Sequence, residues 1–171
     1  MTRTGANRGQ ITGSKADVCS DPNLSLPEFP PIPSQNCIVI DTNIVLDLFV
    51  FKDPATNPLQ QALEGAGATQ LNWLATQPMR DELARVLAYP QIVTRLNFYK
   101  LLADDVLTAF DKHARIVAVA PKASMTCSDA DDQKFIDLAV THKAILLSKD
   151  KAVLSMKKRL LALEIRAQPA I

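Results

Sequence analysis

The sequence of 171 residues has few cysteines, few glycines and no surplus of either charge. Its three cysteines, Cys19, Cys37 and Cys127, are too few and too far apart for a disulfide framework or a zinc pattern, and they fit a reducing cytoplasm. The five glycines form no phosphate-cradling loop, which argues against nucleoside triphosphate binding. With 19 basic and 18 acidic residues the formal charge is +1, so any nucleic-acid binding must be local.

Long apolar runs are also missing. The longest, around residues 44–51, is far shorter than the roughly 20 residues that a membrane span needs, so we expect no membrane partner. Hydrophobic residues nevertheless make up 47% of the chain, which is enough to bury one full core. The length suits a single domain.

Residues 1–35 differ in composition from the rest. Gly, Ser, Thr, Asn and Arg dominate their beginning, and residues 26–33 contain four prolines. This composition predicts a disordered or extended tail, without the apolar region of a secretory signal. The prolines could dock in a groove of a partner, but an extended spacer is the commoner outcome. We expect one folded domain at residues 36–171.

From residue 37 onward, apolar β-forming runs alternate with stretches of helical periodicity. Strands are expected at 37–41, 70–74, 116–119, 144–147 and 164–167. Helical segments are expected at 43–52, 58–64, 78–89, 90–97, 99–113, 130–142 and 152–161. Such alternation predicts an α/β fold, with one three-layer α/β/α domain built around a central, mainly parallel, twisted sheet.

Two carboxylates follow predicted strands. Asp41 ends the apolar run 37–40, and Asp150 comes shortly after the run 144–147. In open α/β sheets, ligands bind just beyond the carboxyl ends of the strands. Both acids therefore have the position of site residues.

Helical spacing adds two more acids to this edge of the sheet. Within residues 78–89, Glu82 shares the face of the apolar stripe, whereas Asp81 points to the other side. Within residues 130–142, Asp132 is in line with the apolar stripe and lies in the first turn. We expect Glu82 and Asp132 to face the same rim as the two strand-end acids.

Four crowded carboxylates repel one another unless protons or a cation offset their charge. Hard oxygen donors, with little histidine or thiolate, suit Mg2+ or Mn2+ better than zinc or copper. We therefore predict that Asp41, Glu82, Asp132 and Asp150 hold one or two such ions, with a phosphate as the natural substrate.

Each acid also has a purely structural interpretation. Asp41 could cap the helix that follows, Glu82 could be half of a buried ion pair, and Asp132 could be a first-turn acid favoured by the helix dipole. Four such coincidences at one rim are less probable than a shared role. Asp47, inside the most apolar helix, is interpreted as locally paired or loop-facing.

The motifs that carry these acids resemble, in type and order, those of the PIN-domain nucleases. They are Asp41-Thr42-Asn43, Glu82 within residues 81–87, Asp132 within residues 128–135, and Ser148-Lys149-Asp150. The resemblance covers about residues 37–167. Within that family, the chain is most similar to the branch described as toxin components of toxin–antitoxin pairs. It implies the four acids around Mg2+ or Mn2+, with Asn43 and Ser148 orienting ligands or water. It also implies RNA as substrate, a homodimer and a cognate antitoxin protein.

Two positions near the site have open roles. Lys149 stands where a glycine is common in similar sequences, so its cation could bind a substrate phosphate or compete with a second ion. Asp129 could be a further ligand or a helix cap. Other contacts to a phosphodiester chain could come from Arg80, Arg85, Lys134 or the basic helix at 151–159.

The leading hypothesis is a metal-dependent endoribonuclease that hydrolyses single-stranded RNA and acts as a toxin. One alternative is an aspartate-based phosphatase, which would need a second aspartate where Asn43 stands. Another is a catalytically weak or inactive protein that keeps the fold and binds RNA or a partner.

Overall fold

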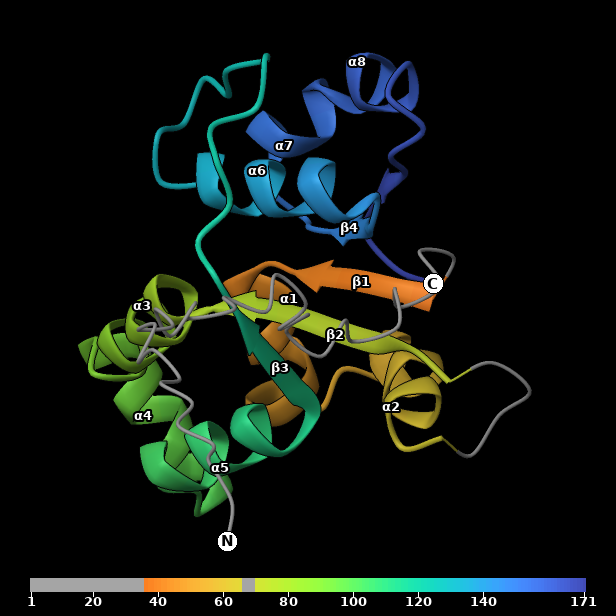
Figure 1. Ribbon diagram of the computed structural model, residues 1–171. Helices are drawn as coiled ribbons and strands as arrows, with labels where there is room; N and C mark the ends of the chain where they lie inside the picture. Colours follow the sequence, from red (N-terminus) through yellow and green to blue (C-terminus); the bar gives the residue numbers. More distant parts are fainter. Residues whose placement is uncertain (1–35, 66–69) are drawn as a thin grey trace, which may run out of the picture. The chain divides into compact units, whose positions relative to one another are not determined.

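The computed structural model describes residues 36–65 and 70–171 of the chain. The predicted tail at 1–35 lies outside the described residues. The described strands form one sheet of five parallel strands in the order β3-β2-β1-β4-β5 (Figure 1). They are β1 (Cys37–Ile40), β2 (Asn72–Thr76), β3 (Ala114–Val117), β4 (Ile145–Leu147) and β5 (Ala167–Gln168). The expected parallel α/β sheet is confirmed.

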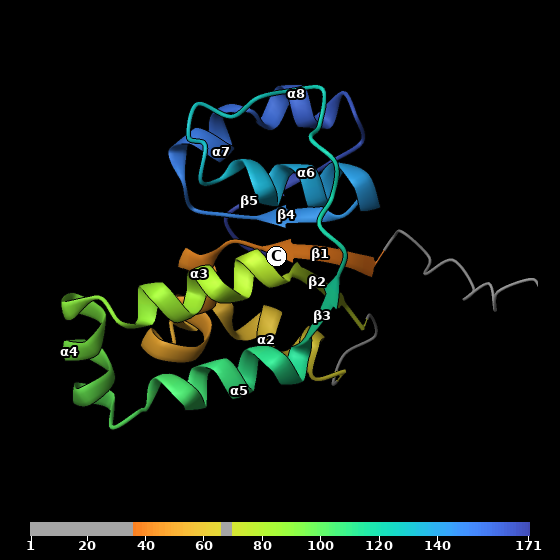
Figure 2. The ribbon, with the colours of Figure 1, turned by 60° about the vertical axis from the view of Figure 1, so that its left-hand side comes forward.

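Helices cover both faces of this sheet. In two views, the helices from α2 to α5 lie on one side of β1 and β2, and α6, α7 and α8 lie on the other (Figures 1 and 2). The helical elements are α1 (Thr42–Leu46), the π-helix η2 (Asp47–Phe51), the 3-10 helix η3 (Pro54–Thr56), α2 (Asn57–Leu63), α3 (Gln77–Leu87), α4 (Pro90–Tyr99), α5 (Ala103–His113), α6 (Gln133–His142), α7 (Lys151–Ser155) and α8 (Lys157–Leu161). The three-layer architecture is therefore as expected.

Helix ends differ from expectation where the backbone turns left-handed. The helix expected at 99–113 begins only at Ala103, because Lys100 adopts φ 55° and ends α4. The strand expected at 164–167 is β5 at Ala167–Gln168, since Glu164 at φ 65° turns the chain out of α8 first. A left-handed residue terminates a helix, and the sequence gives little warning when that residue is not glycine.

Other boundaries shift because of neighbouring elements. The strand expected at 116–119 is β3 at Ala114–Val117, because its partner β2 ends at Thr76 and the ladder stops there. The expected helix 152–161 is divided at Met156 into α7 and α8. The helix expected from 130 starts at Gln133, after a turn.

The centre of the sheet has a reversal of strand order. β1 pairs with β2 on one side and with β4 on the other. The backbone N–H of Asp41 extends the second pairing with a 2.9 Å hydrogen bond to the carbonyl of Leu147. Such a reversal leaves a crevice at the carboxyl ends of the two strands, where α/β proteins bind ligands. Asp41 and residues 148–150 follow these two strand ends.

The core holds this crevice in place. All four residues of β1 are buried, and Trp73 of β2 packs edge-on against Phe110 of α5 with ring centres 4.8 Å apart. Cys37 and Cys127 are buried free thiols. Among the described residues, no helix is both long enough and apolar enough to cross a bilayer.

Candidate active site

Asp41 is a buried carboxylate, with 4% of its surface exposed. Its Oδ2 accepts two hydrogen bonds, one of 2.8 Å from Nδ2 of Asn43 and one of 2.5 Å from Oγ of Ser148. Its side chain makes no capping hydrogen bond to α1. Helix capping therefore does not account for this acid.

Ser148 and Asn43 connect Asp41 to the loop after β4. Ser148 is fully buried, and its Oγ accepts a 2.9 Å hydrogen bond from the backbone N–H of Asp150. Oδ1 of Asn43 accepts a 3.3 Å hydrogen bond from the backbone N–H of Lys149. Asp150 caps α7 by accepting from the backbone N–H of Ala152 at 2.6 Å. The strand-end acids Asp41 and Asp150 are thus joined through one hydroxyl.

Asp132 has a buried carboxylate oxygen that lacks a hydrogen-bond partner. It occupies the N-cap position of α6 without making a capping bond, and its Oδ2 is buried with no hydrogen-bond partner. Burial, together with the charges of Asp41, Asp150 and Asp129, raises the pKa of Asp132 to about 7. A helix dipole would favour the ionised form and lower the pKa, so a dipole role does not explain this acid.

Glu82 lies on α3, the helix that follows β2. As its helical spacing predicts, it faces inward from α3, and its Oε1 accepts a 2.9 Å hydrogen bond from Oγ1 of Thr42. Its Oε2 pairs with the ammonium of Lys134, and the two side chains are only 15% and 24% exposed. The ion-pair interpretation of Glu82 therefore describes its contacts correctly.

The four acids act on one another through their charges. Burial raises the pKa of Asp41 and repulsion from Glu82 adds to that rise, while the Ser148 hydrogen bond lowers it. Asp132 is repelled by both Asp41 and Asp150. Charge thus links Asp41 to Glu82 and to Asp132, and Asp132 to Asp150.

Protein groups already engage four of the eight oxygens of these acids. Glu82 is held by Thr42 and Lys134, and one oxygen each of Asp41 and Asp150 is hydrogen-bonded. Within residues 36–65 and 70–171, no three His, Cys, Asp or Glu side chains stand together in a ready-made metal-binding arrangement. The all-oxygen donor set and the unpartnered Oδ2 of Asp132 nevertheless suit a hard divalent cation.

A comparison with protein families agrees with this geometry. The profile of the PIN domain matches residues 37–152, which is more than half of the chain. The chain belongs to the PIN-domain family. PIN domains are usually nucleases, and they generally use divalent metal ions. No protein of curated function matched the sequence.

Lys149 of this PIN domain forms ion pairs with two acids that are not among the four predicted metal ligands. Its ammonium pairs with Asp47 at 2.7 Å and with Asp53 at 3.2 Å. Asp47 is therefore paired, as expected, but with a residue distant in the sequence rather than a local one. These two acids offset the positive charge of Lys149. Its attraction for a phosphate and its repulsion of a second metal ion are therefore both weak.

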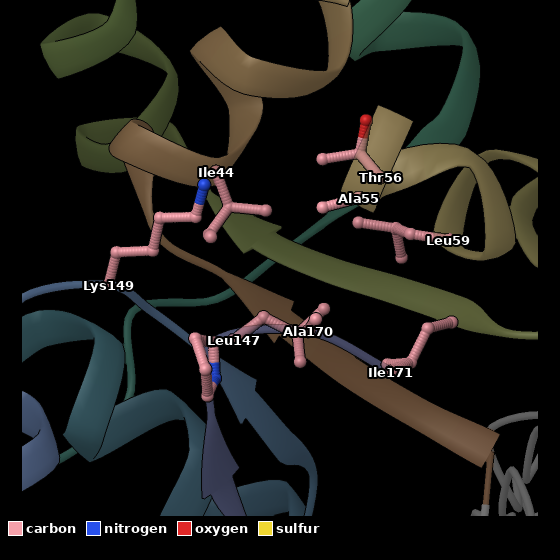
Figure 3. A pocket seen from close by; sticks show the side chains of 9 residues that line it. Ile44, Ala55, Thr56, Leu59, Leu147, Lys149, Ala170 and Ile171 are labelled. Atoms are coloured by element: carbon pink, nitrogen blue, oxygen red, sulfur yellow. The ribbon is translucent and has the colours of Figure 1, made fainter. Parts of the chain in front are cut away.

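Two cavities lie near these residues. A small one, lined by Ile44, Leu147, Lys149 and Ile171 among others (Figure 3), has a volume of about 10 Å3, the space of about one water molecule. A larger one of about 340 Å3 lies beside Glu82 and is lined by Pro78, Asp81, Glu82, Arg85 and Lys134. Only the second is large enough for part of a substrate.

The remaining predicted neighbours have structural contacts. Asp129 is exposed, and its Oδ1 accepts a 2.9 Å hydrogen bond from the backbone N–H of Asp131, so it caps the turn before α6 rather than the helix. Arg80 is bound to Asp111 by two hydrogen bonds of 2.6 and 2.7 Å. The sequence analysis assigned no role to Thr42. Its position between Asp41 and Asn43, both predicted site residues, was the feature that could have indicated one.

Proposed function

We propose that this PIN domain is a metal-dependent endoribonuclease that hydrolyses phosphodiester bonds of single-stranded RNA. The observation that supports this most is the buried, unpartnered Oδ2 of Asp132 beside Asp41 and Asp150. An oxygen left without a partner among repelling acids costs free energy, which a bound cation would recover. RNA as the substrate comes from the resemblance to PIN-domain nucleases.

In the proposed mechanism, Asp41, Glu82, Asp132 and Asp150 would hold one or two Mg2+ or Mn2+ ions. A bound ion supplies Lewis acidity, which lowers the pKa of a water molecule and offsets charge on the phosphate. Asn43 and Ser148 hold Oδ2 of Asp41 in place by hydrogen bonds, and Oδ1 receives neither of these two bonds. No covalent enzyme nucleophile is needed.

The test is replacement of Asp41 by Asn, which keeps the shape of the side chain and removes its charge. We expect Mn2+ binding to be lost and cleavage of single-stranded RNA to fall by roughly a hundredfold or more. Asp104→Asn is the matched control, because Asp104 is an exposed acid in the first turn of α5 and lines neither of the two cavities described above. Binding is measured by calorimetry and cleavage on a labelled oligonucleotide.

The same assay separates the alternatives. Unchanged RNA cleavage by Asp41→Asn would end the ribonuclease proposal. Turnover of a small phosphomonoester through a covalent Asp41 would instead support a phosphatase. Wild-type protein that shows no rise in melting temperature with Mn2+, yet retains RNA, would support a binding protein without catalysis.

For the biological role we propose a toxin, acting in the cytoplasm and held inactive by a cognate antitoxin. Expression should slow growth, and Asp132→Asn should relieve the effect, because the site acid is lost while the fold is kept. Growth curves of the two strains at equal protein levels measure this. A neighbouring reading frame for a small DNA-binding protein would support the pairing with an antitoxin.

We also propose a homodimer. Several large apolar side chains are exposed on α4 and its flanking residues: Tyr89 at 41%, Val93 at 40%, Phe98 at 73%, Tyr99 at 39% and Leu102 at 69%. Exposed apolar groups gathered along one element are typical of an interaction surface. Sedimentation of the full chain, compared with Phe98→Ser, would show a dimer that the substitution weakens.

A further inference from the structure

Lys134 brings a positive charge to the acidic rim from the start of α6. Its ammonium pairs with Oε2 of Glu82 and donates to the backbone carbonyl of Asp131. It also lies 4.8 Å from the centre of the Phe135 ring. These three contacts hold the ammonium against the rim instead of leaving it in solvent.

The same ammonium acts on a second acid. Its charge lowers the pKa of Asp132, against the larger effects of burial and of the neighbouring acids. Among the described residues, no other lysine or arginine forms an ion pair with one of the four rim acids. Lys134 therefore supplies the positive charge that a divalent ion would otherwise bring.

We infer that Lys134 is the resident counter-cation of the acidic rim, and that a divalent ion displaces its ammonium from Glu82 when it binds. The inference rests on the proposed function. Both oxygens of Glu82 are engaged, Oε1 by Thr42 and Oε2 by Lys134. Each oxygen of Glu82 has a further lone pair, so an ion can bind Glu82 while Thr42 stays in place, whereas repulsion between the two cations drives the Lys134 ammonium away.

The displaced ammonium has space to occupy. The 340 Å3 cavity beside Glu82 has Lys134 and Arg85 among its lining residues. A lysine side chain has four rotatable bonds, so its ammonium can leave Glu82 while the α6 backbone stays in place. This side of the rim therefore has two arrangements, one with Lys134 on Glu82 and one with the divalent ion there.

The experiment is a calorimetric titration of the full chain with Mn2+ at pH 8, where Asp132 is ionised. Removal of the competing charge in Lys134→Met should make Mn2+ bind roughly three- to tenfold more tightly than to the wild type. Lys134→Arg keeps the charge and should bind like the wild type. Lys143→Met is the matched control, because Lys143 pairs with the exposed Glu164 at 2.8 Å, and it should also bind like the wild type.

Unchanged or weaker Mn2+ binding by Lys134→Met overturns the inference, and so does equal tightening in Lys134→Arg. If Lys134→Met does not fold, Lys134→Gln gives the same comparison. A wild type that fails to bind Mn2+ refutes the proposed function itself. If Asp41→Asn abolishes binding while Lys134→Met leaves it unchanged, only the role of Lys134 is refuted.

Discussion

The hydroxyl of Ser148 connects two of the rim acids, Asp41 and Asp150. It donates to Asp41 and accepts from the backbone N–H of Asp150, and it is fully buried. A hydrogen bond to an ionised carboxylate stabilises the charged form. Ser148 therefore lowers the pKa of Asp41, against the larger effect of burial, which raises it.

Ser148→Ala should weaken both function and stability. Loss of the hydroxyl raises the pKa of Asp41 further and leaves the Asp150 N–H without a partner. We expect cleavage to fall roughly 10- to 100-fold and the free energy of unfolding to fall by about 1–3 kcal/mol. Ser155→Ala is the control, because the exposed Ser155 only donates to the carbonyl of Ala152 at 2.7 Å. Equal behaviour of the two variants in denaturant titration and in the cleavage assay would contradict this role.

Asp132 predicts a dependence of stability on pH. Its pKa of about 7 in the folded protein lies above the ordinary value of 3.8, so the folded state binds the proton more tightly than the unfolded state. The resulting stabilisation is fully present below about pH 4 and is lost as the pH rises through about 7. Ionisation of Asp132 near neutral pH thus lowers the stability of the folded protein.

Asp132→Asn should therefore be more stable than the wild type at pH 8 in the absence of metal, by roughly 1–2 kcal/mol after allowance for solvent screening. The difference should vanish near pH 4. Mn2+ at pH 8 should stabilise only the wild type. Denaturant unfolding at the two pH values measures this, and a wild type whose stability rises between pH 5 and 8 relative to Asp132→Asn would refute it.

At the scale of elements, helix ends offer a test that is independent of the site. Lys100 ends α4 in the left-handed region with φ 55° and ψ 40°. This conformation is strained for lysine and favourable for glycine. The fold imposes it because α4 must turn into α5 within a few residues.

Lys100→Gly should raise the free energy of unfolding by about 0.5–1 kcal/mol, because it removes the strain at the helix end. Arg95→Gly, at an exposed position in the middle of α4, should lower it by about 0.5–1 kcal/mol, since glycine is unfavourable within a helix. Thermal melts of both variants give the comparison. A destabilised Lys100→Gly would show that the side chain makes contacts that outweigh its backbone strain.

At the scale of the whole molecule, the described sheet and core lie in residues 36–65 and 70–171. These described residues belong to one compact unit. We predict that a chain starting at residue 36 folds by itself, with a melting temperature within about 2 °C of the full chain. Circular dichroism measures this. A large loss of melting temperature would show that the first 35 residues belong to the folded domain.

The order of elements could be predicted from the sequence, because buried parallel strands and packed helices leave different apolar periods. The run at 37–40 and the stripe that includes Leu83 gave β1 and α3 without any structure. The boundaries at Lys100 and Glu164 could not be predicted, since a left-handed lysine or glutamate has no local signature. The packing of neighbouring elements imposes it.

The sequence by itself determined the fold class and indicated the four acids as candidate site residues, because strand ends and helical faces are local properties of the chain. Tertiary structure alone decided how those acids are held. Ser148 meets Asp41 across 107 positions of sequence and Thr42 meets Glu82 across 40. Lys149 is drawn to Asp47 and Asp53, whereas Lys134 takes the place beside Glu82. Partners so far apart in the chain are selected by the crossing of strands, which no local pattern records.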